Sequence, residues 1–505
     1  MSFRAKLAVG AAKLTSTLIR KMKRGSGVTL PGFIARIICP NILSIMASMV
    51  KKRVIVTMGT NGKTTTNALM YQILRAEGNK VIINKTGANM LNGIISAFVL
   101  ETRSDGTLDA DYACLEVDEI ASAIVLPMLK PHCALLTNIS RDQLDRFGEV
   151  DAVYQKIKTA CKSSPNSTLI INCDDVLSYT LAVESGNPIV TYGINDEIFD
   201  EISRSEIRES TFCLICNQKL GYTFFHYGQL GMYNCPNCHI ERPNPDYIAT
   251  NVNRENEVYS FLIRTANDDG SLETSSFKTG RVNSYDEISI DNENTTRETH
   301  VANRASKEAT SCRFIDKGLL IHSSSRNTYN IYNTLSAVAT ICTLEADVPN
   351  IKKSIEDFDF GNNREDIFNI DGARVQLHLA KNPIGFQQKM SLILKDKELK
   401  DIVILINDTY QDGEDVSWLW DVDFQHLAKA NARTLIAAGS RKYDVGLRLK
   451  YEDISCDFTD NIQETIKDLI GNGTKNIYLV INYSSLYSIN RFLNMLATER
   501  KVKED

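Results

Sequence analysis

The chain has 505 residues, of which 43% are hydrophobic and 24% charged. That length exceeds one ordinary core, and the usual domain size implies about three structural units. The composition is that of a soluble globular protein and excludes a largely disordered chain. The net charge of −5 says little about partners, but the charges are unevenly distributed along the chain.

Residues 1–50 form a basic N-terminal segment. No aspartate or glutamate occurs before Glu77, whereas lysines and arginines recur throughout this stretch. Its most apolar part, Phe33–Val50, is interrupted by Arg36 and Pro40, so the sequence predicts neither a signal peptide nor a membrane span. Two interpretations remain open. The segment is either a solvated basic helix or is attracted to an anionic membrane surface or a pyrophosphate-bearing lipid.

A glycine-containing turn follows, with the sequence VIVTMGTNGKTTT from residue 54 onward. Arg53–Thr57 predicts a short buried strand and Thr64–Glu77 a helix. A strict P-loop pattern requires glycine in place of Thr57, so the motif match fails. The physical requirements for a phosphate site nevertheless remain, because the glycines permit a tight turn, the lysine neutralises phosphate charge and a threonine hydroxyl ligates magnesium. The candidate nucleotide-binding residues are Gly59, Thr60, Asn61, Gly62, Lys63, Thr64 and Thr65, with Thr64 also a magnesium ligand.

The alternative is a strand that merely turns at Asn61-Gly62, but this leaves the Lys-Thr-Thr run unexplained. Polar residues also follow two later apolar runs. Tyr112–Glu116 ends in carboxylates, and a later strand ends in Thr137-Asn-Ile-Ser-Arg-Asp142. Ligands bind at the carboxyl ends of strands in open α/β sheets. The sequence therefore predicts a magnesium and phosphate site that includes Glu116.

Four of the twelve cysteines form two Cys-x2-Cys pairs separated by 18 residues. Such spacing places four thiolates around a tetrahedral zinc ion, and the absence of a secretion signal argues against disulfides. Because sulfur fills all four positions, the zinc is expected to be structural. The segment carries few positive charges, which favours a packing or docking module over a nucleic-acid reader. The predicted zinc ligands are Cys213, Cys216, Cys235 and Cys238.

Alternating strands and helices predict an α/β fold with a largely parallel sheet across residues 51–345. The four-cysteine ribbon at 205–245 interrupts this central domain. A polar stretch at 267–311 interrupts it again and is expected to be disordered. Residues 346–505 alternate a second time and predict a C-terminal α/β domain.

Several motifs of the first domain resemble the Mur ligase superfamily: Gly59–Thr65, the Glu116 edge, Thr137–Asp142, Asn172–Asp175 and Asn330–Asn333. The resemblance implies a central P-loop ATPase domain that uses ATP and Mg2+ to convert a carboxylate to an acyl phosphate, which an amine then attacks. It implies a catalytic role for Lys63 on the transferring phosphoryl group. It also implies that Asn330 and Asn333 lie on the adenine side of the nucleotide-binding site. Gln143 stands where amino-acid-adding members usually carry histidine.

The second half resembles the MurT family of synthetase subunits. It carries His378-Leu-Ala-Lys-Asn-Pro383, where other Mur ligases show Asp-Tyr-Ala-His-Asn-Pro, and then the acidic segment Asp412–Asp421. The resemblance implies a heterodimer with a class I glutamine amidotransferase subunit of the GatD type. An aspartate of this chain would complete the partner's Cys-His triad, with Asp415 the candidate and Asp412 the alternative. Without the resemblance, Asp412–Trp418 would instead be interpreted as a turn that leads into a strand.

The reaction so implied is amidation of the α-carboxylate of D-glutamate in the lipid II stem peptide, which gives D-isoglutamine during peptidoglycan biosynthesis. The expected place is the cytoplasm, with peripheral contact at the inner face of the membrane. Two alternatives remain open. One is a stand-alone Mur-like ligase that attaches an amino acid, such as a polyglutamate synthetase, and the other is a zinc-ribbon ATPase that binds nucleic acid.

Overall fold

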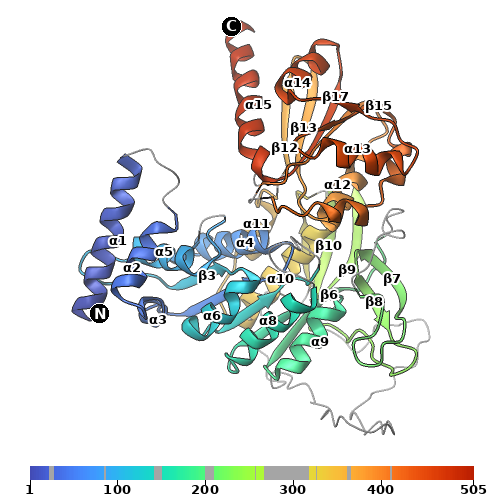
Figure 1. Ribbon diagram of the computed structural model, residues 1–505. Helices are drawn as coiled ribbons and strands as arrows, with labels where there is room; N and C mark the ends of the chain where they lie inside the picture. Colours follow the sequence, from blue (N-terminus) through green and yellow to red (C-terminus); the bar gives the residue numbers. More distant parts are fainter. Residues whose placement is uncertain are drawn as a thin grey trace.

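The computed structural model describes residues 1–21, 28–84, 87–140, 150–198, 210–255, 258–266, 315, 318–325, 327–360, 365–409 and 412–504. Figure 1 shows a central domain built on a large sheet, with the C-terminal domain seated above it. Helices α1–α3 lie at one end of the central sheet and the β7–β8 hairpin at the other. The predicted α/β class, with a central domain, a cysteine ribbon and a second α/β domain, is confirmed.

The central sheet has nine strands in the order β11-β10-β9-β6-β5-β4-β1-β3-β2. From β2 to β9 the neighbours are parallel, and β10 and β11 are antiparallel additions at one edge. The strands are β1 (Arg53–Met58), β2 (Val81–Ile83), β3 (Tyr112–Glu116), β4 (Cys133–Leu136), β5 (Thr168–Asn172), β6 (Ile189–Ile194), β9 (Tyr247–Glu255), β10 (Val258–Thr265) and β11 (Leu319–His322).

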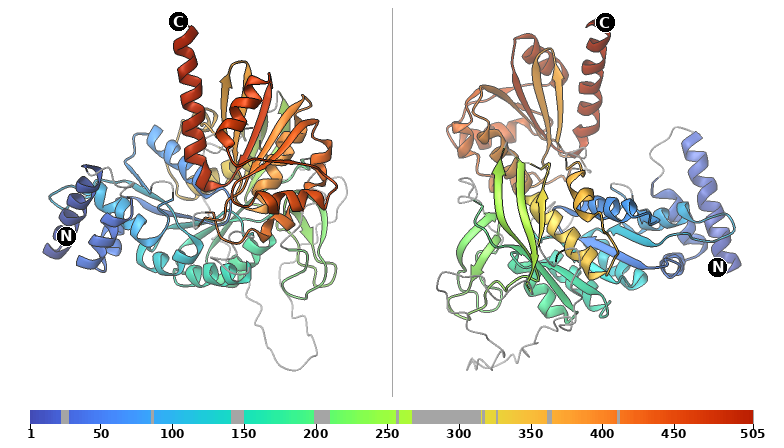
Figure 2. Two further views of the ribbon diagram at one scale, coloured as in Figure 1. Left: turned by 45° about the horizontal axis from the view of Figure 1, so that its top comes forward. Right: turned by 180° about the vertical axis from the view of Figure 1, so that it is seen from behind.

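Helices cover both faces of this sheet (Figure 2), which is why its central strands are apolar throughout. Within β1, Val54 and Val56 belong to one hydrophobic core and Ile55 to the core on the opposite face. The first core includes side chains of α5 (Leu91–Glu101), α6 (Glu119–Leu129), α8 (Val150–Lys162) and α9 (Val176–Ser185). The second includes α4 (Lys63–Ala76), α10 (Tyr329–Thr343) and α11 (Ile351–Glu356).

The basic N-terminal segment forms α1 (Phe3–Lys21), α2 (Leu30–Ile38) and α3 (Ile42–Ala47). Helix α1 packs against α2 and α5, and it buries a face of small residues that includes Ala5, Ala8 and Ala12. The segment is therefore not a fully solvated helix, because one side of α1 is part of the core. No helix among the described residues has the length and apolarity needed to cross a membrane.

The C-terminal domain has a six-stranded sheet in the order β12-β13-β17-β14-β15-β16, parallel except for β12. Its strands are β12 (Glu365–Ile370), β13 (Ala373–Leu379), β14 (Lys400–Leu405), β15 (Ala432–Ala438), β16 (Asp457–Phe458) and β17 (Asn476–Ile481). Its helices are α12 (Pro383–Lys395), α13 (Lys442–Lys450), α14 (Ile462–Gly471) and α15 (Tyr483–Glu504), with short 3-10 turns η2 (Ser417–Asp421) and η3 (Phe424–Lys429).

The cysteine ribbon contains the hairpin β7 (Gly221–Tyr227) and β8 (Leu230–Asn234) and is joined to the central domain by a buried polar network. Arg242 donates through Nε to Asp174 Oδ1 at 2.6 Å, and both side chains are almost fully buried. Arg242 also donates to Asn195 Oδ1 at 2.8 Å. The Tyr332 hydroxyl of α10 lies 2.6 Å from Asp174 Oδ2 and 2.6 Å from Nδ1 of the ribbon's His226. The ribbon is thus tied to the sheet and to α10.

The predicted polar insertion at 267–311 and the first residues of the predicted ribbon, 205–209, lie outside the described residues. Several strands were not predicted, among them β6, β9, β10 and β11. The strands β9 and β10 form an antiparallel pair whose exposed positions carry polar residues, so they lack the continuous apolar pattern of the central strands.

The variant Arg242→Met is expected to lower the free energy of unfolding of the central domain by about 3–5 kcal/mol, because it leaves the Asp174 carboxylate buried without its cation. Far-UV circular dichroism in a urea titration would report the loss. The only tryptophans, Trp418 and Trp420, belong to the C-terminal domain, so the fluorescence transition should not move. The exposed ribbon cation gives a matched control, Lys219→Met, which should be silent. Equal stability of both variants would contradict a structural role for this ion pair.

Candidate active site

The predicted phosphate turn lies between β1 and α4, at the carboxyl edge of the parallel strands. Gly59 and Gly62 have φ values of 115° and 88°, a backbone region that favours glycine. A Cβ at Gly59 would collide with Thr137 and Asn138, and a Cβ at Gly62 would collide with Asn333. The two glycines are therefore required both by the conformation of the turn and by the close approach of its neighbours.

The segment after β4 clamps the phosphate turn through a set of backbone and side-chain hydrogen bonds. The Thr60 N–H donates to the Asn138 carbonyl at 2.9 Å, and the Thr60 hydroxyl donates to the Ser140 carbonyl at 2.9 Å. The Asn61 N–H donates to Asn138 Oδ1 at 3.1 Å, and the Thr137 hydroxyl donates to the Asn61 carbonyl at 2.7 Å. The two predicted motifs thus form one unit. Arg141 and Gln143, which follow, lie outside the described residues.

Lys63 and Thr64, the first residues of α4, each contact a carboxylate. Lys63 Nζ donates to Glu119 Oε1 at 2.6 Å and also to the Gly59 carbonyl. The Thr64 hydroxyl donates to Glu116 Oε2 at 2.8 Å. Burial raises the pKa of Glu119, and the neighbouring Lys63 ammonium opposes that rise. A cation, a hydroxyl and two carboxylates beside a phosphate turn are suited to hold a nucleotide phosphate with its magnesium ion.

Glu119 was not among the residues selected from the sequence. Glu119 is the first residue of α6, three positions after Glu116 at the end of β3, so both carboxylates lie at the same edge of the sheet. The acidic run Glu116-Val-Asp-Glu119 in the sequence was the signal that could have identified it. Asp118 has a different role, because it caps α6 by accepting from the Ile120 N–H at 3.0 Å.

The predicted adenine-side residues lie on α10 behind the turn. Asn333 Oδ1 accepts from the Thr66 hydroxyl at 3.3 Å, and Asn333 Nδ2 donates to Asn330 Oδ1 at 2.7 Å. Asn330 in turn donates to the Ser325 hydroxyl at 2.7 Å. The described contacts of Asn333 are thus with the phosphate turn and its helix, whereas Asn330 supports Asn333. Thr65, also predicted, is buried in the first turn of α4.

Both remaining units of the chain also reach this site. From the C-terminal domain, Asn382 Nδ2 donates to Asn61 Oδ1 at 3.1 Å. From the turn of the ribbon hairpin, Gln229 Nε2 donates to the Ile139 carbonyl at 2.6 Å and to Asp175 Oδ1 at 3.2 Å. Gln229 therefore supports the clamp segment from behind. The sequence offered no local pattern that selects it, because its role depends on where the hairpin docks.

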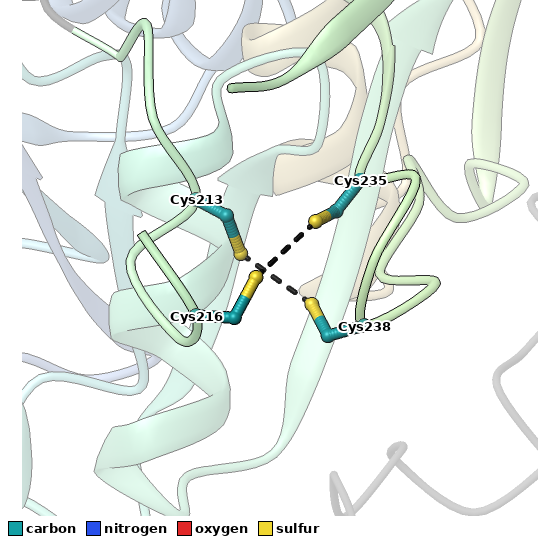
Figure 3. A group of neighbouring side chains, drawn as sticks. All are labelled: Cys213, Cys216, Cys235 and Cys238. Atoms are coloured by element: carbon teal, nitrogen blue, oxygen red, sulfur yellow. Dashed lines mark hydrogen bonds between the residues drawn. The ribbon is translucent and has the colours of Figure 1, made fainter. Parts of the chain in front are cut away.

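The four predicted cysteines converge on one point (Figure 3). Their sulfur atoms all lie within 4.8 Å of one another, with Cys213 and Cys238 3.5 Å apart and Cys216 and Cys235 3.4 Å apart. Disulfide bonds are about 2.0 Å long, so none joins these pairs. Sulfur atoms around a tetrahedral zinc ion are about 3.8 Å apart, given Zn–S bonds of about 2.3 Å. The donor set therefore fits zinc.

The two knuckles share one backbone design. Cys213 and Cys235 each accept at their carbonyl oxygen the N–H of the residue four positions later, Asn217 and His239. These two residues have φ values of 57° and 58°, which turn the chain back toward the metal site. His239 therefore shapes a turn, and His226 is engaged with Tyr332, so the expectation of four sulfur ligands agrees with the geometry.

The two candidate triad aspartates differ in their surroundings. Asp412 is buried and accepts from the Thr409 hydroxyl at 2.7 Å and the Ser484 N–H at 2.8 Å, so it holds the start of α15. Asp415 is half-buried and accepts from the N–H and hydroxyl of Ser417 at 2.7 and 2.9 Å. Asp415 is therefore the more accessible of the two.

An exposed apolar surface lies near Asp415, and we call it the α13 patch. Tyr443, Leu447 and Tyr451 follow one another at four-residue intervals and are exposed. The ring of exposed Trp420 meets that of Tyr451 at a centroid distance of 5.1 Å. Helix α13 contacts η2, the turn that Asp415 precedes. Contiguous aromatic surface of this kind marks protein interfaces.

The ribbon is expected to hold one zinc ion per chain, measured by elemental analysis of the purified protein. Cys216→Ser should lose most of the metal and destabilise the ribbon, because structural zinc supplies folding free energy. Cys456→Ser is the matched control, since that thiol belongs to the C-terminal domain. Retention of stoichiometric zinc in Cys216→Ser would contradict ligation by that thiolate.

Known proteins with related sequences or folds give the family. Residues 56–240 match the family model of the Mur ligase middle domain, and residues 379–486 match that of the MurT ligase C-terminal domain. The chain is 31% identical over 448 residues, 88% of each chain, to subunit MurT of the glutamine-hydrolyzing lipid II isoglutaminyl synthase of Staphylococcus aureus. It is 28% identical over 508 residues, all of each chain, to the same subunit of Streptococcus pneumoniae.

A solved structure supports the fold. The MurF ligase of Thermotoga maritima, solved in complex with ADP, superposes with a TM-score of 0.57 at 12% identity and covers 95% of this chain and 85% of its own. Together, the two family models and the identity to the Staphylococcus aureus subunit lead to one conclusion: the chain belongs to the MurT family of Mur ligases.

Proposed function

We propose that this chain amidates the α-carboxylate of D-glutamate in the stem peptide of lipid II, with ATP and with ammonia from a glutaminase subunit. The observation that carries the proposal is the clamped phosphate turn with Lys63, Glu116 and Glu119, in a chain whose closely related family members are named as synthase subunits. The product would be D-isoglutamine in the peptidoglycan precursor.

The first step would be phosphoryl transfer. A carboxylate oxygen of the substrate attacks the γ-phosphorus of ATP, ADP leaves, and an acyl phosphate results. Lys63 would stabilise charge on the transferring group, and the backbone N–H groups of the turn would hold the phosphates. Glu119 balances the charge of Lys63 through an ion pair at 2.6 Å. Thr64, Glu116 and Glu119 would hold Mg2+. The bound ion would lower the electrostatic repulsion between the substrate carboxylate and the phosphates.

The second step would be attack of ammonia on the acyl carbon, with inorganic phosphate as the leaving group, which takes up the proton that the nitrogen loses. Ammonia is small and carries no carboxylate to be recognised. A site for it therefore needs fewer side chains than one that binds an amino acid. The replacement of histidine by Gln143 in the sequence is consistent with such a loss.

The ammonia would come from a class I glutaminase bound at the α13 patch. Hydrolysis of glutamine there needs a cysteine nucleophile and a histidine, and a third, acidic group that orients the histidine. Asp415 supports this role because it is partly accessible and precedes η2, which packs on α13. Asp412 suits it less, because its carboxylate is buried and holds the start of α15, whereas the Asp415 carboxylate is half-buried and its oxygens are bonded to Ser417 in the same exposed turn.

Amidation should be reconstituted from this chain, its candidate glutaminase, ATP, glutamine and lipid II, with conversion of carboxyl to amide followed by mass spectrometry. Lys63→Ala should reduce the rate about a hundredfold to a thousandfold with either glutamine or ammonium as donor, because charge stabilisation in the phosphoryl transfer is lost. Lys162→Ala, at the exposed end of α8, is the control. If neither glutamine nor ammonium supports amidation by the wild-type pair, the proposed function is wrong.

Asp415→Asn should lose glutamine-dependent amidation by roughly a thousandfold or more, because the partner's histidine is no longer oriented, yet retain the ammonium-dependent rate. Asp412→Asn should instead lower the melting temperature and affect both donors alike. Steady-state rates with each donor, measured side by side, separate the two. Equal loss with both donors in Asp415→Asn would remove Asp415 from the triad.

A further inference from the structure

Helix α1 has two different faces. One side buries small residues, among them Ala5, Ala8 and Ala12, against α2 and α5. The other side carries large apolar residues that point away from the fold. They are Phe3, Leu7, Leu14 and Leu18, with exposed fractions of 84%, 55%, 62% and 50%. Because successive residues of an α-helix are about 100° apart, these four positions lie within about 60° of one another around the helix axis.

Helix α2 adds a second exposed apolar row beside α1. Leu30, Phe33 and Ile37 are 44%, 39% and 58% exposed and follow the helical spacing of three and four residues. The opposite side of α2 is fixed to the central domain, where the Gly32 N–H donates to the Ser96 hydroxyl of α5 at 2.8 Å. The exposed rows thus belong to helices that are firmly packed. We call these seven residues the N-terminal stripe.

Cations border this stripe, and no carboxylate belongs to it. Helix α1 contains no acidic residue, and the first one in the chain is Glu77. Around the helix, Lys6 and Lys13 lie on one side of the apolar row and Arg4 on the other, while Lys21 continues the row. The structure records no ion pair for Lys6, Lys13 or Lys21 within the part of the chain that it describes. The carboxylate near Lys6 is that of Asp105, which accepts from the N–H and hydroxyl of Thr107 at 2.8 and 2.7 Å.

The stripe lies at one end of the molecule. Figures 1 and 2 show α1 and α2 at the end of the central domain opposite the β7–β8 hairpin, with the C-terminal domain above the other part of the sheet. A flat surface can therefore meet α1 without meeting the ribbon. The phosphate turn follows α3 and β1 directly in the chain.

We propose that the N-terminal stripe docks the protein on an anionic membrane surface, with α1 lying in the plane of the interface. A helix with a narrow row of large apolar side chains and flanking lysines has the character of an interfacial helix, whose apolar face enters the acyl boundary while its cations meet anionic headgroups. A protein partner is less favoured, because lysine is depleted in protein interfaces.

The inference deepens the proposed function, on which its biological purpose rests, because a lipid-linked substrate is confined to a membrane. The docking itself requires neither nucleotide nor glutamine. It is also separate from the α13 patch, which lies in the other domain.

The full-length protein should float with vesicles of phosphatidylcholine plus phosphatidylglycerol, and much less with phosphatidylcholine alone. Raising the salt concentration should weaken the binding. Leu7→Ser/Leu14→Ser should reduce the partition coefficient about tenfold or more, because two exposed apolar side chains are removed. Leu320→Ser/Leu399→Ser is the matched control, since these leucines are similarly exposed elsewhere and should not change binding.

Three results would overturn the proposal: no binding of the wild type to the anionic vesicles, an unchanged partition coefficient in the stripe variant, or a wild-type dimer that the stripe variant converts to a monomer without any vesicle binding. Circular dichroism and zinc content would verify that the variants are folded. The comparison of vesicle types needs only the wild type, so it remains decisive if a variant misfolds.

The amidation assay separates this inference from the proposed function. With lipid II in detergent micelles, the stripe variant should keep the wild-type rate, whereas with lipid II in anionic vesicles its rate should fall about tenfold. Flotation without any amidation by the wild type would reject the proposed function alone. Amidation without flotation would reject the membrane docking alone.

Discussion

The close approach of backbone around Gly59 and Gly62 is the constraint on which the rest of this structure depends. The turn has room for no Cβ at either position, because Thr137, Asn138 and Asn333 already occupy that space. This crowding is also what aligns the turn, since the same neighbours supply its hydrogen bonds. A preorganised phosphate site needs several contacts that fix the turn before phosphate binds, because reorientation of its N–H groups on binding would cost free energy. Glycine is thus both a conformational and a steric requirement here.

The zinc ribbon belongs to this supporting structure. A segment of its size buries too little apolar surface to fold alone, so metal binding would supply part of its folding free energy. The contacts that join the ribbon to the domain are the buried pair of Arg242 and Asp174 and the hydrogen bond that Gln229 donates. Through Gln229 the ribbon contacts the segment that clamps the phosphate turn. Its position argues for a structural part in building that site.

The two ends of the molecule expose different kinds of side chain. The N-terminal end carries exposed aliphatic side chains among cations, whereas the C-terminal domain exposes aromatic side chains on α13. The phosphate turn lies between these ends and receives Asn382 from the C-terminal domain. This arrangement fits the proposed reaction, in which a lipid-borne carboxylate, a nucleotide and an externally generated amine meet at one place. The difference in chemistry agrees with the two proposed occupants, since a bilayer and a protein are recognised by different side chains.

The sequence by itself determined the features that depend on local spacing: the α/β class, the glycine turn with Lys63 and Thr64, the acidic edge at Glu116 and the four cysteines. These are properties of one turn, one strand end or one knuckle, so a short stretch of residues contains them. Only the tertiary structure decided which distant groups meet. Glu119 reaches Lys63 because α6 starts above β3, and Gln229 reaches Ile139 because the hairpin docks there. It also separated Asp412, enclosed by α15, from the accessible Asp415, since burial is set by packing between elements and not by the order of residues.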